Sequence, residues 1–162
     1  MPKLSTILEL AEELSNLGGT IYGSLAWHIH VSPRFPLKFR DYEIDVSFSS
    51  NEGILELLEE LGYERIEGEE KECIKEALGY GGVEDKYQHF FRKNGVIVDV
   101  STRPTKMESE IREFCGYQIK VITRRELLKA YKRAGRRKDI PTKKRFVYLG
   151  MLFLLIASDA FP

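Results

Sequence analysis

Cysteine is scarce in this chain of 162 residues, and that scarcity argues against two classes of small protein. The two cysteines, Cys73 and Cys115, stand far apart and lack the paired spacing of a zinc site. A disulfide-stabilised secreted scaffold is disfavoured on the same ground, and we expect two reduced thiols in a cytoplasmic protein. Asparagine and glutamine are almost as rare, while Glu, Lys and Arg dominate, a balance typical of thermophile proteins.

The chain also lacks an apolar run long enough to cross a membrane. The longest run, from Phe146 to Ala157, falls short of the roughly 20 residues that a bilayer requires. It predicts a buried core helix, and the alternative is a contact between two copies of the chain in a homodimer. The first residues alternate apolar and acidic side chains at helical spacing, so we expect neither a signal peptide nor a membrane partner.

Net charge is absent as well, because 25 Lys and Arg balance 25 Asp and Glu. The balance is uneven along the chain, since residues 120–145 carry twelve basic side chains against only Glu126 and Asp139. Such a segment can bind a polyanion, either a triphosphate or an RNA backbone, and a solvated helix face is the alternative. The 43% hydrophobic and 31% charged content is typical of a soluble globular protein, and we expect one domain over residues 1–162.

Periodicity and turn signals predict an α/β (α+β) protein, with a small mixed sheet, helices packed on it and further helices at the C-terminal end. Helices are predicted at 3–17, 24–31, 51–61, 123–134 and 141–158, with Asn51, a Thr123–Glu126 capping box and Pro141 marking three starts. Strands are predicted at 20–22, 42–48, 87–93, 96–101 and 118–122, with Asn94-Gly95 as a type I′ hairpin turn. We expect residues 67–85 to form a surface excursion with a short helix, and residues 105–115 to be helix or loop.

The first fragment of a candidate site is Gly23-Ser24, which stands between the strand at 20–22 and the following helix. Free N–H groups at a helix N-terminus, together with the helix dipole, favour a phosphate. Glycine allows close approach of the backbone, and the serine adds a hydroxyl group. The pair alone is also typical of an ordinary turn with a helix cap.

Carboxylates form the second and third fragments. Glu43 and Asp45 are two residues apart on a predicted strand, so they project from the same face. Asp99 stands within the apolar run from Val96 to Val100, where a buried carboxylate is costly unless it is paired, hydrogen-bonded or metal-bound. Oxygen ligands gathered in this way suit Mg²⁺ or Mn²⁺, although a solvent-exposed strand face would explain either fragment taken alone.

The order of these fragments resembles the nucleotidyltransferase fold of the DNA polymerase beta superfamily, and within it the small minimal-type nucleotidyltransferases. These include antibiotic adenylyltransferases and toxin-like nucleotidyltransferases. The end of the chain is similar too, with Glu126 to Lys132 followed by Gly135-Arg136-Arg137-Lys138-Asp139 and a further helix. The resemblance implies transfer of a nucleoside monophosphate, most simply AMP from ATP, to a hydroxyl acceptor with release of pyrophosphate. Alternatives are an inactive nucleotide- or RNA-binding module and a toxin-type enzyme that modifies tRNA or protein.

Carried over by position, the resemblance implies that Gly23 and Ser24 contact phosphate. It implies that Glu43, Asp45 and Asp99 hold Mg²⁺ or Mn²⁺ and carry the catalysis of a nucleoside triphosphate substrate. Triphosphate contacts would come from basic residues near the end of the chain, namely Lys129, Lys132, Arg136 and Lys138. The chain departs from the family at Glu43, where the shorter aspartate is more usual. The acceptor, whether a small molecule, RNA or protein, is left open.

Overall fold

The computed structural model describes residues 2–35, 43–49, 52–79, 82, 84–136 and 142–160. Its elements, in chain order, are α1 (Leu4–Asn16), β1 (Thr20–Tyr22), α2 (Gly23–Val31), β2 (Glu43–Ser47), α3 (Ile54–Glu60), β3 (Glu64–Ile66), α4 (Gly68–Ala77), β4 (Gln88–Lys93), β5 (Val96–Ser101), β6 (Ser109–Phe114), β7 (Tyr117–Ile122), α5 (Arg124–Arg136) and α6 (Thr142–Ala160). The predicted α/β class is confirmed.

Seven described strands form one mixed sheet in the order β3-β4-β5-β2-β1-β7-β6. The pairs β2–β5 and β1–β7 are parallel, and the other neighbours are antiparallel. The β4–β5 hairpin turns at Asn94 and Gly95, whose positive φ angles of 53° and 78° are those of the predicted type I′ turn. The sheet is mixed, as predicted, and larger than expected, because both of its edge strands escaped prediction.

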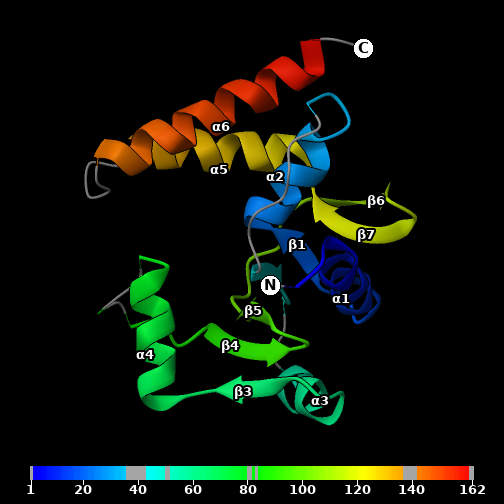
Figure 1. Cartoon of the computed structure of the whole chain (residues 1–162), viewed down its shortest axis with the longest axis vertical. Coiled ribbons are helices and arrows are strands. Elements are labelled where there is room, and N and C mark those ends of the chain that lie inside the picture. Colours follow the sequence, from blue (N-terminus) through cyan, green and yellow to red (C-terminus); the bar gives the residue numbers. More distant parts are fainter. Residues whose placement is uncertain are drawn as a thin grey trace.

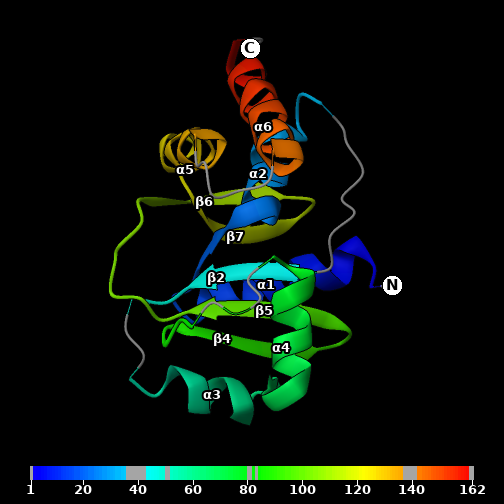
Figure 2. The ribbon, with the colours of Figure 1, turned by 90° about the vertical axis from the view of Figure 1, so that its left-hand side faces the viewer.

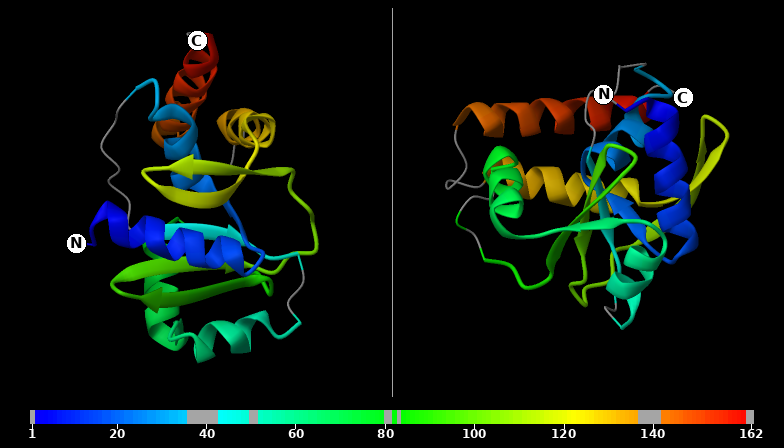
Figure 3. Two further views of the ribbon diagram at one scale, coloured as in Figure 1. Left: turned by 90° about the vertical axis from the view of Figure 1, so that its right-hand side faces the viewer. Right: turned by 60° about the horizontal axis from the view of Figure 1, so that its bottom comes forward.

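Helices cover the two faces of the sheet (Figures 2 and 3). Helix α1 packs across β7, β1 and β2 through an apolar stripe that includes Ile7, Ala11 and Leu14. On the opposite face, α2 packs on β1 and β2 and also contacts α5 and α6. Helices α5 and α6 lie side by side at one end of the molecule (Figure 1). Helix α4 lies on the same face as α2, and its C-terminal end approaches the start of α6.

Three predictions about local structure are corrected. Residues 105–115 are not helix or loop throughout, because Ser109–Phe114 forms β6 and pairs with β7. The edge strand β3 was not predicted at all. Helix α3 begins at Ile54 with Gly53 as its N-cap, so the predicted cap at Asn51 is wrong. The alternation of apolar and polar residues is weak in edge strands, because an edge strand packs against only one neighbouring strand and its residue types are less constrained.

Helix α6 differs most from its prediction as a buried core helix. Leu155 is fully buried, but Phe146 and Phe153 are each 69% exposed. Among the described residues, no helix combines the length and the apolar character needed to span a membrane.

Candidate active site

The register of two parallel strands brings the predicted carboxylates together. Strand β2 pairs with β5 so that Asp45 lies opposite Asp99. Glu43 precedes Asp45 by two residues and so projects from the same face of the strand. Ligand oxygens of all three side chains lie within 4.8 Å of one another. The extra methylene of Glu43 therefore does not keep its carboxylate away from the two aspartates.

Asp45 and Asp99 are held in an environment that disfavours their charge. Burial raises the pKa of Asp45 well above its usual range, and the negative charges of Glu43 and Asp99 raise it further. Burial also raises the pKa of Asp99 to about 7, with a further contribution from the charge of Glu43. A cation placed among the carboxylates would relieve both effects.

Asp99 is only 2% exposed, and its two oxygens have different surroundings. Gln88 Nε2 donates a hydrogen bond of 3.1 Å to Oδ2, which opposes the rise in the Asp99 pKa. Oδ1 is buried, and no described residue donates a hydrogen bond to it. A buried carboxylate oxygen without a donor is costly, and a bound cation is one way to satisfy it.

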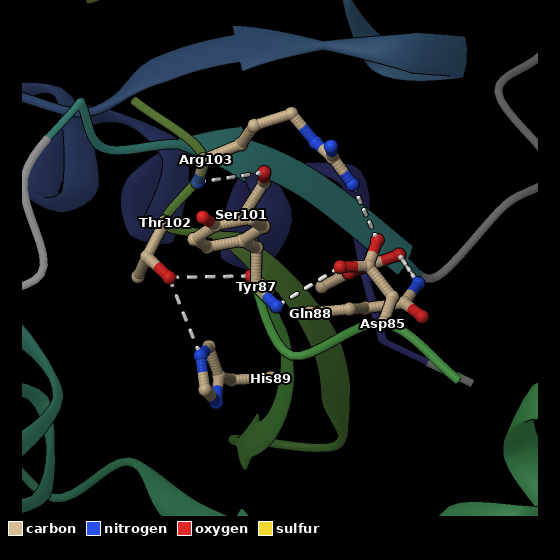
Figure 4. A network of polar contacts seen from close by, with 8 residues as sticks. Asp85, Tyr87, Gln88, His89, Ser101, Thr102 and Arg103 are labelled. Atoms are coloured by element: carbon tan, nitrogen blue, oxygen red, sulfur yellow. Dashed lines mark hydrogen bonds and ion pairs between the residues drawn. The ribbon is translucent and has the colours of Figure 1, made fainter. Parts of the chain in front are cut away.

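A polar network fixes the strand ends around Asp99 (Figure 4). Asp85 accepts a hydrogen bond of 2.9 Å from the Tyr87 backbone N–H and one of 3.0 Å from Arg103. The Arg103 guanidinium also lies over the Tyr87 ring, 5.1 Å from its centroid. These contacts tie the segment that follows β5 to the segment that precedes β4.

Gly23 brings the backbone of α2 into direct contact with the acids. Strand β1 pairs with β2 so that Tyr22 lies opposite Asp45, and Gly23 follows immediately. Its φ of +70° is in the left-handed region, and a Cβ atom there would lie 2.1 Å from Asp45 Oδ2. Only glycine fits this position without displacing the carboxylate.

The N-terminus of α2 opens into a cavity of about 940 Å³, which Gly23 and Ser24 both line. The N–H groups of the first helical turn have no partner within the helix, so this end of the cavity suits an anionic group. Glu43 and Asp45 line the same cavity, whereas Asp99 lies behind them. The turn that was predicted to contact phosphate therefore lines the same cavity as two of the three carboxylates.

Other residues that line the cavity supply positive charge and apolar surface. The basic lining residues are Arg103, Lys106, Lys129, Arg133 and Lys144, and the apolar ones include Leu78, Met107, Tyr148 and Met151. Among the described residues, Glu126 is the one acid of the lining apart from Glu43 and Asp45. A lining that combines basic and apolar side chains suits both phosphates and a flat apolar group such as a nucleobase.

The structure separates the four basic residues that the sequence predicted as triphosphate contacts. Lys129 lines the cavity, while Lys132 is exposed and is not among the lining residues. Arg136 ends α5, and its side chain lies outside the described residues, as does the whole of Lys138. Arg133 takes the place that was predicted for Lys132, because it lies one helical turn after Lys129.

Sequence reasoning missed Gln88, Arg103 and Lys144. Arg103 had a readable signal, since a basic residue two positions after a strand that carries a site acid lies at the same end of the sheet. Gln88 and Lys144 had none, because strand pairing places the first against Asp99 and the docking of α6 places the second at the cavity.

No protein-family profile matches the chain, and no curated protein sequence matches it. Solved structures do. One is the antibiotic-resistance factor ANT(2'')-Ia, at a TM-score of 0.55 and 16% identity, covering 98% of this chain and 85% of that one. Another is the lincosamide antibiotic adenylyltransferase LnuA in its lincomycin-bound form, at a TM-score of 0.57 and 10% identity. The match covers 96% of this chain and 98% of that one.

A third similar structure is an antigenic nucleotidyltransferase-like protein from Paracoccidioides brasiliensis, at a TM-score of 0.55 and 14% identity, covering 94% of this chain and 74% of that one. These identities are low, so the likeness speaks to architecture and not to substrate. The chain has the nucleotidyltransferase fold over nearly its full length, and its predicted resemblance to antibiotic adenylyltransferases is confirmed at the level of the fold.

Proposed function

We propose that this chain is a metal-dependent nucleotidyltransferase. It transfers a nucleoside monophosphate, most simply AMP from ATP, to a hydroxyl group of an acceptor and releases pyrophosphate. The supporting observation is the convergence of Glu43, Asp45 and Asp99 beside the N-terminus of α2, at the wall of a cavity with basic lining. The fold adds support, since a structural neighbour, ANT(2'')-Ia, has been solved with adenylyl-2''-tobramycin.

The donor set fits Mg²⁺ or Mn²⁺. Carboxylate oxygens are the ligands these cations prefer, and the buried Oδ1 of Asp99 has no donor among the described residues. We assign Glu43, Asp45 and Asp99 as the ligands. When bound, the metal would lower the pKa of the acceptor hydroxyl and neutralise charge on the entering and leaving oxygens.

The protein itself positions the reactants. Backbone N–H groups at Gly23 and Ser24 hold phosphate oxygens, and cavity lysines and arginines hold the β- and γ-phosphates. The acceptor oxygen forms a bond to the α-phosphorus, while the bond from that phosphorus to the bridging oxygen of the β-phosphate breaks. The bonding electron pair leaves with pyrophosphate, and the hydroxyl proton passes to solvent. Basic residues that bind pyrophosphate stabilise the negative charge that it gains as it leaves.

Incubation of the folded chain with Mg²⁺ and each α-labelled nucleoside triphosphate, with and without cellular RNA and protein, tests the proposal. We expect label transfer and pyrophosphate release, both abolished by Asp45→Asn. The matched control is Glu113→Gln, which neutralises an exposed acid on β6, far along the sheet from the cluster. Triphosphate binding without label transfer or pyrophosphate under every condition would instead identify an inactive nucleotide-binding module.

A second candidate is a toxin-type enzyme whose acceptor is RNA. The observation that favours it is helix α5, which carries six basic residues and only one acid, Glu126. Arg125, Lys129, Lys132 and Arg133 are exposed on it, so a basic stripe runs past the cavity mouth. Expression of the wild-type chain should then arrest growth, and Asp45→Asn should restore it. Normal growth with the wild type would count against this candidate.

A further inference from the structure

Helix α6 presents an apolar face that the rest of the described chain leaves uncovered. Phe146 and Phe153 are each 69% exposed, Ile156 is 51% exposed and Leu149 is 43% exposed. The helix lies at the outer end of the molecule, where it contacts α5 and α2 on its other sides (Figures 1 and 2). Exposed apolar patches of this kind mark interaction sites.

Large and small residues alternate along this face. Phe146, Gly150, Phe153 and Ala157 follow one another at spacings of four, three and four, so they form one line along the helix. A Cβ atom added at Gly150 would meet no atom of the described residues within 4 Å, so none of them fills the space above Gly150. When the same line is turned end to end, Phe146 faces Ala157 and Phe153 faces Gly150. The face is therefore complementary to itself about a two-fold axis between residues 151 and 152.

The charges at the two ends of α6 select the antiparallel arrangement. Lys143, Lys144 and Arg145 stand in the first turn, while Asp159 stands near the last residue of the helix. A parallel pair would bring three cations against three cations. An antiparallel pair places them at the carbonyl end of the partner helix, where the macrodipole favours positive charge.

The size of the face is sufficient for association. Its two phenylalanines alone expose roughly 200–350 Å² on each copy. With Val147, Leu149 and Ile156 included, two copies would bury on the order of 1,000 Å², the lower bound for a specific interface.

We propose that the apolar α6 face binds a second copy of the same chain, as an antiparallel helix pair in which each phenylalanine packs over a small residue of the partner. This pairing is independent of the proposed activity. It bears on the site all the same, because Lys144, Tyr148 and Met151 line the cavity from the other side of the same helix. Pairing would fix the wall that they form.

Mass measurement of the full chain by light scattering at tens of micromolar protein tests the pairing. The wild type should have twice the monomer mass of 18.7 kDa. Gly150→Leu should give the monomer mass, since the new side chain has room within one copy and fills the space that the partner's Phe153 needs. Phe153→Glu should also be monomeric. Circular dichroism and Tm of both variants should match those of a folded chain.

The control is Ile111→Glu, which removes a 62%-exposed apolar side chain on β6, outside the α6 face. It should remain dimeric. A monomeric wild type, or a Gly150→Leu variant that stays dimeric, would overturn the proposal. Recruitment of a monomeric wild type to phosphatidylcholine–phosphatidylglycerol vesicles would overturn it in favour of a lipid surface.

The direction of the helices is tested separately with a spin label at Lys143→Cys. The background is Cys73→Ser with Cys115→Ser, because both native cysteines are exposed. An antiparallel pair centred between residues 151 and 152 separates the two labelled positions by about 25 Å along the helix axis. A parallel pair would place them about 10 Å apart, the usual interaxial distance, and that result would contradict the proposed arrangement.

Discussion

Gly23 is the residue at which the fold and the candidate chemistry meet. Its left-handed backbone allows the chain to turn from β1 into α2 directly beside Asp45. The same turn directs the free N–H groups of the helix toward the space that the acids line. One glycine thus places the proposed phosphate site and the proposed metal site side by side.

Gly23→Ala should disrupt this arrangement. The new Cβ would lie 2.1 Å from Asp45 Oδ2, so the carboxylate must move, and the left-handed φ adds about 1–2 kcal/mol of strain. Gly53→Ala is the matched control, because Gly53 has almost the same φ, +71°, and nothing within 4 Å. Urea unfolding should show a larger loss of stability for Gly23→Ala, and only this variant should lose the rise in Tm caused by Mn²⁺. Equal losses in both variants would contradict the assigned contact.

Asp99→Asn should stabilise the metal-free chain. At pH 8, above the Asp99 pKa of about 7, repulsion among acids whose oxygens lie within 4.8 Å of one another costs on the order of 1–3 kcal/mol, and the amide removes the Asp99 charge. The variant should therefore unfold at higher urea concentration in EDTA than the wild type. Mn²⁺ should stabilise the wild type and have little effect on Asp99→Asn. A less stable variant in EDTA would show that the Asp99 charge supports the fold, contrary to this account.

At the scale of elements, His30 connects α2 to β7. Its Nε2 donates a hydrogen bond of 2.8 Å to the Ile122 carbonyl, while its Nδ1 is buried and has no hydrogen-bond partner in the part of the chain that the structure describes. Burial lowers the pKa of His30 below 6.5. Arg112 and Arg124 lower it further, and the Ile122 hydrogen bond and Glu110, whose Oε1 lies 3.9 Å away, act in the opposite direction.

The His30 contribution to the unfolding free energy should consequently fall as the pH drops below about 6.5, whereas Asp45 and Asp99, whose raised pKa values make the folded chain bind protons there, contribute in the opposite direction. In that range His30 binds a proton in the unfolded chain but stays neutral in the folded chain. This difference lowers the unfolding free energy by at most about 1.4 kcal/mol per pH unit. His30→Gln keeps a donor for Ile122 and removes the titration. In urea unfolding between pH 7 and pH 5, the unfolding free energy of this variant should fall less, or rise more, toward pH 5 than that of the wild type. Parallel curves for the two proteins would contradict the contribution of His30.

Helix α5 divides its basic residues between the cavity and solvent. Lys129 and Arg133 line the cavity, while Arg125 and Lys132 are exposed outside it. Lys129→Ala with Arg133→Ala should weaken triphosphate binding about 10-fold or more, equivalent to about 1.4 kcal/mol. Arg125→Ala with Lys132→Ala removes the same charge and should change the Kd little. Titration of both double variants with a fluorescent triphosphate gives the two Kd values. Similar weakening in both would show that the positive charge of α5 as a whole, and not contact in the cavity, favours binding.

At the scale of the whole molecule, sequence predicted the parts of the fold that local signals encode. Asn94-Gly95 fixed one hairpin, and the alternation at Glu43 and Asp45 placed two acids on one face. It could not predict β3 and β6, whose pairing is set by strands distant in sequence. The sequence also did not predict which apolar side chains of α6 face the core and which face solvent, because the run is apolar on all sides. The choice between Lys132 and Arg133 likewise depends on how α5 docks.

Metal and triphosphate binding should be coupled across the whole site. Without metal, the acids of β2 and β5 repel the triphosphate, and without triphosphate the metal lacks the phosphate oxygens as ligands. A non-hydrolysable triphosphate analogue should therefore tighten Mn²⁺ binding, measured by calorimetry, by about 5–150-fold, and Mn²⁺ should tighten analogue binding by the same factor. Asp45→Asn should bind the analogue more tightly than the wild type in EDTA, because one repelling charge is gone, and should lose most of the coupling. Equal Mn²⁺ affinity with and without the analogue would show that the acids and the phosphate-binding turn do not act as one site.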